Sequence, residues 1–120
     1  MNLLEETIKT LEENNKKPKD VLWCGSEEFG YFKWKEFKEL SDFEYDNGFG
    51  HQEVAGDLII VGNDWWLERQ EYDGSEWWEY KTFPEKPKNK IIPKVISNSQ
   101  LSGYTWDKNL LDLNKNYERN

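Results

Sequence analysis

The side chains of this 120-residue chain that could take part in chemistry are mostly carboxylates: 24 acidic residues against one histidine and one cysteine. Hydrolysis of a glycosidic bond uses two carboxyl groups across a cleft, one of them with a raised pKa. Among so many acids a pair at a suitable distance arises by chance, and no motif selects one pair. The carboxylates therefore do not predict an active site.

The other candidates for catalysis are His51 and Cys24. A lone histidine can act as a general base, but no Ser or Cys motif accompanies Gly50-His-Gln-Glu. Cys24 ends a short apolar run that is typical of an ordinary strand. We expect His51 to have a loop or capping role, and we expect the protein not to be an enzyme, with no catalytic residues.

Metal and cofactor motifs are also missing from the sequence. There is no C-x-x-C pattern and no His/Cys cluster that would hold a metal. Residues 46–50, DNGFG, resemble a calcium loop only superficially, because the ordered oxygen ligands and the terminal Glu of that loop are missing. The glycines fit no phosphate-binding pattern. We expect no metal and no cofactor.

Two tryptophan pairs stand in the segment WWLERQEYDGSEWW, residues 65–78. Consecutive side chains of a strand point to opposite faces, so one ring of each pair should face the core and the other should face outward. Either the N-terminal helix or the tail covers the outer rings, or a partner binds them, and the sequence leaves both open. The acids around the rings suit a basic partner, whose Arg or Lys side chains would stack on Trp and pair with Glu. These acids are Glu68, Glu71, Asp73, Glu76 and Glu79. The predicted partner-binding residues, not all of which can face the partner, are Trp65, Trp66, Glu68, Glu71, Tyr72, Trp77, Trp78 and Glu79.

Negative charge is concentrated in the middle of the chain. Residues 20–82 carry sixteen acidic and five basic side chains, a net charge of −11, whereas the whole chain carries −8. Such a field repels nucleic acids and anionic membranes and attracts basic surfaces, although it also serves solubility alone. The first seventeen residues lack the apolar run of a signal peptide, and no stretch is long enough to span a membrane. We expect a cytoplasmic protein.

The helices and strands that must position these residues can be predicted from the sequence, and together they indicate an α+β fold. Apolar stripes predict helices at about residues 3–15 and 34–43, the second with Trp34, Phe37, Leu40 and Ser41 on one face. Residues 20–24 and 29–32 read as short extended pieces. From residue 57 to 82 we expect a three-stranded antiparallel meander, whose apolar run 58–61 is a buried central strand and whose Asp-Gly turn joins the last two strands.

We expect one acidic domain over residues 1–96. A tail over residues 97–120 follows it, extended or helical, with an order that depends on docking. The helical stripe of the tail is weak and consists of Leu110, Leu111 and Leu113.

The strings EYDNGFG, DLIIVG, WWLERQEYDGSEWWEYK and FPEKP resemble small acidic proteins encoded by tailed phages and prophages of Bacillus and related bacteria. The resemblance covers about residues 18–87. In length and character the chain is also similar to a phage anti-defence inhibitor of a defence-associated sirtuin. That resemblance implies a host partner, an NAD-degrading sirtuin effector triggered by a phage tail-tube protein, and a place of action in the host bacterial cytoplasm. It implies no residue roles.

The expected function is therefore that of a phage-encoded anti-defence inhibitor that binds a sirtuin NADase and blocks its activation without catalysis. The alternative is a nucleic-acid mimic that inhibits a host defence nuclease, supported by the acid density of residues 20–82. A structural protein of the virion is a further rival that no sequence feature favours.

Overall fold

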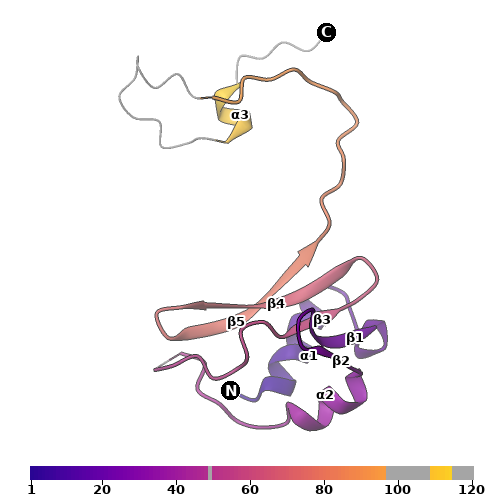
Figure 1. The fold of residues 1–120 in the computed structure, drawn as a ribbon, viewed down its shortest axis with the longest axis vertical. Coiled ribbons are helices and arrows are strands. Elements are labelled where there is room, and N and C mark those ends of the chain that lie inside the picture. Colours follow the sequence, from indigo (N-terminus) through magenta and orange to yellow (C-terminus); the bar gives the residue numbers. More distant parts are fainter. Residues whose placement is uncertain (49, 97–108, 115–120) are drawn as a thin grey trace. The chain divides into compact units, whose positions relative to one another are not determined.

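The computed structural model describes residues 1–48, 50–96 and 109–114. The chain forms two compact units, Met1–Pro84 and Glu85–Asn120 (Figure 1). The first unit holds the sheet and two helices, so its fold is α+β as predicted. Among the described residues, no helix has both the length and the apolar character needed to cross a membrane.

One antiparallel sheet of five strands, in the order β2-β1-β3-β4-β5, organises the first unit (Figure 1). Three of its strands form the predicted meander: β3 at Ile59–Val61, β4 at Trp65–Tyr72 and β5 at Ser75–Thr82. The prediction of only three strands was wrong, because β1 at Trp23–Ser26 pairs with β3, and β2 at Gly30–Phe32 pairs with β1. The two short extended pieces thus extend the meander, and β3 is the central strand.

The turn between β4 and β5 forms where the Asp-Gly dipeptide predicted it. Asp73 and Gly74 have φ angles of 51° and 87°, the two positive values of a tight hairpin turn that matches the strand twist. The two strands pair over their whole length, from Tyr72 with Ser75 to Trp65 with Thr82. This register decides which side chains share a face.

Helix α1 spans Leu3–Glu13, two residues shorter than predicted. The Asn2 side chain caps its start by accepting a hydrogen bond from the Glu5 backbone N–H at 3.0 Å. Its buried stripe is Leu3, Thr7 and Leu11, spaced four residues apart. The polar Thr7 belongs to this stripe because its hydroxyl donates to the Leu3 carbonyl oxygen at 2.7 Å.

Helix α2 spans Trp34–Leu40 and buries Phe37, as the apolar pattern predicted. Leu40 was expected on the same face, but its side chain is 65% exposed, and the helix ends there rather than at residue 43. A short 3-10 helix at Pro18–Asp20 replaces the start of the strand predicted at residues 20–24.

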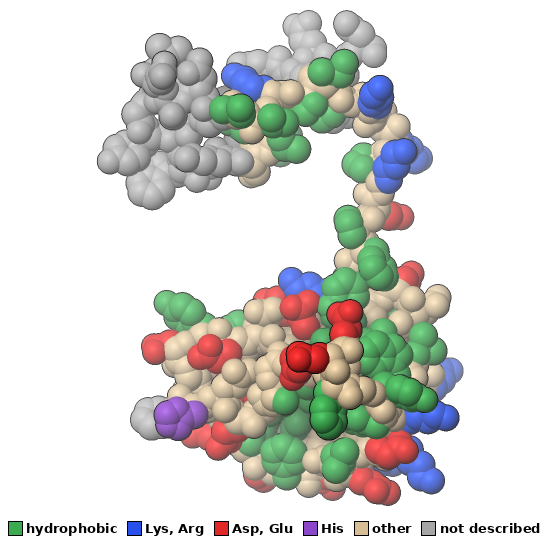
Figure 2. Space-filling model, viewed as in Figure 1, with side chains coloured by type: hydrophobic (Ala, Val, Ile, Leu, Met, Phe, Trp, Pro, Cys, Tyr) green, Lys and Arg blue, Asp and Glu red, His purple; other side chains and the backbone are tan. Residues whose placement is uncertain are grey.

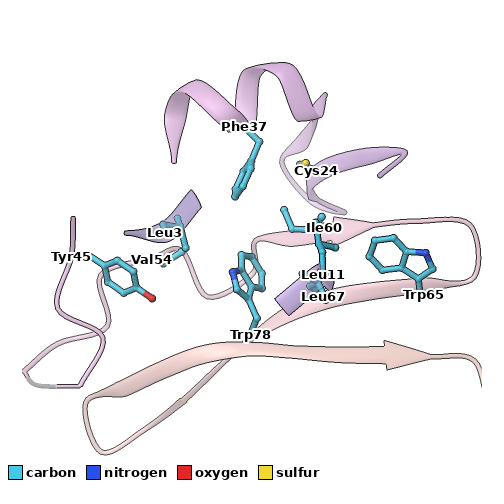
Figure 3. Packing of buried hydrophobic residues seen from close by; sticks show 10 residues of the cluster. All are labelled: Leu3, Leu11, Cys24, Phe37, Tyr45, Val54, Ile60, Trp65, Leu67 and Trp78. Atoms are coloured by element: carbon cyan, nitrogen blue, oxygen red, sulfur yellow. The ribbon is translucent and has the colours of Figure 1, made fainter. Parts of the chain in front are cut away.

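Both helices pack on the same face of the sheet, which we call the inner face (Figure 3). Phe37 of α2, together with Leu3 and Leu11 of α1, packs in one core with Cys24, Ile60, Trp65, Leu67 and Trp78 of the strands. Among the described residues of Met1–Pro84, no α-helix packs on the opposite face of the sheet, which we call the outer face.

The second unit begins with residues 85–96, which have no regular secondary structure, and contains the helix α3 at Leu110–Leu113. The Asn114 side chain accepts a hydrogen bond from the Lys94 N–H and donates one to the Lys94 carbonyl oxygen, both at 2.9 Å. Most of the predicted tail, residues 97–108 and 115–120, lies outside the described residues. Its docking stays a prediction.

Candidate functional site

The two tryptophan pairs divide between the faces of the sheet as strand alternation predicts. Trp65 and Trp78 lie on the inner face and are 3% and 6% exposed. Trp66 and Trp77 lie on the outer face, where Trp66 is half-buried and Trp77 is 38% exposed. Trp65 and Trp78 were predicted as partner contacts, but they belong to the core, so a partner has no access to most of either ring.

Trp78 lies among the buried hydrophobic residues of the core (Figure 3), and a hydrogen bond holds its indole there. Its indole N–H donates to the Thr7 hydroxyl at 2.9 Å, which in turn donates to the Leu3 carbonyl oxygen. A buried indole N–H needs such a partner, because leaving it unbonded costs about 1–3 kcal/mol. Thr7 thus explains how a tryptophan of β5 fits against α1.

The acid Glu76 also lies in the core, against the expectation that it belongs to the acidic surface around the rings. Its side chain accepts hydrogen bonds from the backbone N–H groups of Glu53 at 2.6 Å and Val54 at 3.1 Å, and from Arg69 at 2.8 Å. Only 1% of the residue is exposed. The sequence does not show which of these acids has hydrogen-bond donors in the interior, because the donors come from residues distant in the chain.

Arg69 is the cation that balances this interior. Its guanidinium pairs with Glu76 and, at 3.3 Å, with Glu6 of α1, and it donates to the Tyr45 hydroxyl at 3.0 Å. Burial acts to lower the pKa of Arg69, but its bonds to Glu76 and Tyr45 and the charge of Glu6 outweigh it and raise that pKa. Tyr45 also bonds to Glu6, and burial and this bond raise the pKa of its hydroxyl. The cluster joins β4, β5, α1 and the loop before β3.

On the outer face, the strand register places side chains in two cross-strand rows. The first row consists of Trp23, Val61, Trp66 and Lys81, each opposite the next. The second row consists of Gly25, Ile59, Glu68 and Glu79. The outer face therefore combines an apolar, aromatic row with a neighbouring row that carries two carboxylates.

The side chains around Trp66 are ordered by contacts within the face. The Trp66 indole N–H donates to Glu68 Oε1 at 2.9 Å, and the Phe83 ring meets Trp66 edge-on with a centroid distance of 5.3 Å. The other Glu68 oxygen accepts from the Gln70 amide at 3.1 Å. Lys81 pairs with Glu79 at 3.2 Å. Trp66 is thereby held in a defined orientation while part of its ring stays accessible.

A groove of about 740 Å³ crosses this face. Its apolar lining includes Trp23, Ile59, Val61, Trp66 and Phe83, and its carboxylates are Glu27, Asp57 and Glu68. A second hollow of about 570 Å³ shares Trp23 and Glu27 and extends to Leu22 and Tyr31. Hydrophobic and acidic side chains also lie side by side on the face of Met1–Pro84 seen in Figure 2.

Five of the eight predicted contact residues therefore lie on the outer side of the β4–β5 hairpin: Trp66, Glu68, Tyr72, Trp77 and Glu79. Glu71 lies on the inner side but is exposed near the turn, where its carboxylate accepts from the Gly74 N–H at 3.3 Å. The prediction missed the contribution of Trp23, Ile59, Val61 and Phe83. The continuous apolar run 58–61 concealed that alternate residues of β3 face outward.

The residues weighed for catalysis are not brought together. His51 is exposed in the loop before β3, and Cys24 is buried in β1. Burial, with a smaller contribution from the charge of Glu36, raises the pKa of the Cys24 thiol to about 12. The thiol therefore keeps its proton at neutral pH, which is unsuited to a nucleophile. Within the described ranges, no three His, Cys, Asp or Glu side chains form a group that could hold a metal ion.

Comparison with family models, curated proteins and solved structures gives no match to this chain.

Proposed function

We propose that this protein acts without catalysis, as an inhibitor that binds another protein through the outer face of its sheet. The observation that carries the proposal is the one-sided packing of Met1–Pro84. Both of its α-helices cover the inner face, and the outer face leaves Trp66, Trp77 and Phe83 partly accessible. Accessible tryptophans next to a groove are typical anchors of protein interfaces.

The proposed target is a host defence protein, and the candidate is an NAD-degrading sirtuin effector. This part of the proposal comes from the resemblance to Bacillus phage proteins. The inhibitor would act in the host bacterial cytoplasm, bind the effector and prevent its activation, so that the infected cell keeps its NAD. The acidic side chains would steer a basic surface of the target towards the groove.

The alternative function is that of a nucleic-acid mimic, which would bind a host defence nuclease and inhibit it. The net charge of −11 over residues 20–82 supports it. The two proposals differ in the role of the aromatic residues. Mimicry predicts binding that weakens steeply with salt and is competed by DNA, whereas aromatic anchors predict binding that persists at moderate salt.

The test is capture of the candidate sirtuin from Bacillus lysate by the tagged, full-length protein. Wild type is compared with the double variant Trp66→Ala and Trp77→Ala, which removes the outer rings and leaves the core intact. The matched control is Leu40→Ala, because Leu40 is 65% exposed but lies on α2, which covers the opposite face. Circular dichroism checks that all three proteins are folded.

We expect wild type and the Leu40 variant to capture the sirtuin and the double variant to lose it. Capture that is equal in all three proteins would overturn the assignment to the outer face. No capture of the sirtuin by wild type would overturn that target. Release of the bound protein by DNA would support the nucleic-acid mimic instead.

A further inference from the structure

The second row of the outer face places two like charges directly opposite each other. Glu68 of β4 is the cross-strand partner of Glu79 of β5, and both side chains project from the same face. Directly opposed like charges destabilise a sheet. Lys81 forms an ion pair with Glu79 at 3.2 Å. Among the described residues, no basic side chain forms an ion pair with Glu68.

The donors that Glu68 does have are both neutral. They are the Trp66 indole N–H at 2.9 Å and the Gln70 side-chain amide at 3.1 Å. These bonds orient the carboxylate beside the Trp66 ring without cancelling its charge. A carboxylate accepts several hydrogen bonds, so Glu68 retains capacity for a further, charged donor.

The groove around Glu68 is negative as well as aromatic. Glu27 and Asp57 also line it, and its walls include the rings of Trp23, Trp66 and Phe83. Among the described residues that line the groove, the one basic residue is Arg69, whose guanidinium already pairs with Glu76 and Glu6. A cationic and partly apolar group would complement such a lining.

Of the cationic side chains, arginine fits this arrangement best. Its planar guanidinium stacks on an aromatic ring with its face and binds a carboxylate with its edge, and it gives up less hydration than the ammonium of lysine. Trp66 and Glu68 provide these two partners side by side. Stacking of a guanidinium on a tryptophan ring is favourable at an accessible site and more favourable when the pair is desolvated.

We propose that the groove of the outer face binds an arginine side chain of the partner protein, stacked on Trp66 and paired with Glu68. This inference rests on the proposed protein-binding function and names the chemistry of the partner. Glu27 and Asp57 would favour further basic residues next to that arginine.

The test is a titration of the full-length, 15N-labelled protein, followed by the indole N–H signals of its tryptophans. The Trp66 signal is identified by its loss in Trp66→Phe, and it reports on the site because this N–H bonds to Glu68. The probes are three capped tripeptides, Ala-X-Ala, in which X is arginine, lysine or citrulline. Citrulline has the shape of arginine without its charge.

We expect a saturable shift of the Trp66 signal with the arginine peptide, binding that is several-fold weaker with lysine, and no saturable shift with citrulline. Glu68→Gln keeps an oxygen for the Trp66 N–H but removes the charge, and it should weaken arginine binding at least tenfold, which is about 1.4 kcal/mol. The matched control is Glu12→Gln, which removes the same charge from an exposed position of α1 and should not change binding.

Equal shifts with arginine and citrulline, or equal binding by the Glu68 and Glu12 variants, would overturn the inference. A Trp66 shift that depends on protein concentration without any peptide would overturn it in favour of a second copy of the chain. The two proposals fail separately. Target capture that needs Trp66 and Trp77 but tolerates Glu68→Gln would leave the protein-binding function in place and remove the arginine site.

Discussion

Arg69 and Glu76 form an ion pair inside the protein, with 2.8 Å between Nη2 and Oε1 and no exposure of either side chain. The pair is diagonal across the β4–β5 hairpin, and Glu76 also binds two backbone N–H groups of the loop before β3. On its inner face, the β4–β5 hairpin is therefore held in place by a buried ion pair and its hydrogen bonds as well as by apolar packing.

Removal of one member of this pair should destabilise the protein strongly. Glu76→Gln keeps the shape of the side chain but leaves Glu6 as the only acid paired with Arg69 among the described residues, and a broken buried pair costs about 3–5 kcal/mol. Urea denaturation measures the loss. The control is Glu71→Gln, because Glu71 is directly opposite Glu76 but exposed. The stability of this control variant should stay near that of wild type. Equal stability of the two variants would contradict the buried network.

The neighbouring tryptophans of β5 should respond in opposite ways to truncation. Trp78→Ala empties a core position and breaks the bond to Thr7, so the free energy of unfolding should fall by about 3–5 kcal/mol. Trp77→Ala removes an outer ring and should leave stability nearly unchanged while it weakens partner binding. Thermal unfolding and target capture are measured on both variants. A large stability loss in Trp77→Ala alone would reverse the assignment of faces.

Glu68→Gln should stabilise the protein even as it impairs recognition. It removes the like-charge opposition to Glu79, a relief of about 0.2–1 kcal/mol, and its amide oxygen still accepts from Trp66. A rise in the melting temperature at low ionic strength, which shrinks in high salt, is the expected observation. A fall in melting temperature would show that the carboxylate contributes to the fold rather than to binding.

Cys24 should make the protein less stable in alkaline solution. Burial raises the pKa of the thiol from 9.0 to about 12, so the unfolded chain loses this proton at a lower pH than the folded chain. The contribution of the protonated thiol to the free energy of unfolding is therefore complete below about pH 9. It is lost as pH rises towards 12, by at most about 1.4 kcal/mol per pH unit.

The measurement is urea denaturation of wild type and Cys24→Ala at pH 8 and pH 10. Stability of the wild type should fall more between these values than stability of the variant. Parallel falls would mean that the thiol titrates alike in both states.

Gly62 should not tolerate a side chain, because a Cβ atom there would lie 2.0 Å from a carbon of the Trp65 ring. Gly62→Ala must displace that buried ring, at a cost of about 1–3 kcal/mol or more. Gly48→Ala is the control, since its added Cβ has no neighbour within 4 Å. Chemical denaturation of both variants should separate them clearly, and equal midpoints would contradict the packing of Trp65 over Gly62.

The sequence by itself determined the local elements. The 3–4-residue apolar spacing of α1, the alternation along β4 and β5 and the Asp73-Gly74 turn each depend on near neighbours, and each is present in the structure. The same alternation showed that one ring of each tryptophan pair faces inward. These features follow from backbone geometry and from residues a few positions apart, so a single chain is enough to read them.

Only the tertiary structure decided which ring of each pair is accessible, that β1 and β2 extend the meander, and that Glu76 is a core residue. If the strand register changed by one residue, or if the helices covered the other face, Trp66 and Trp77 would be buried and Trp65 and Trp78 would be accessible. That choice depends on contacts between distant segments, such as Thr7 with Trp78 and Glu76 with Val54. These contacts join residues that are far apart in the sequence, so a pattern of neighbouring residues does not reveal them.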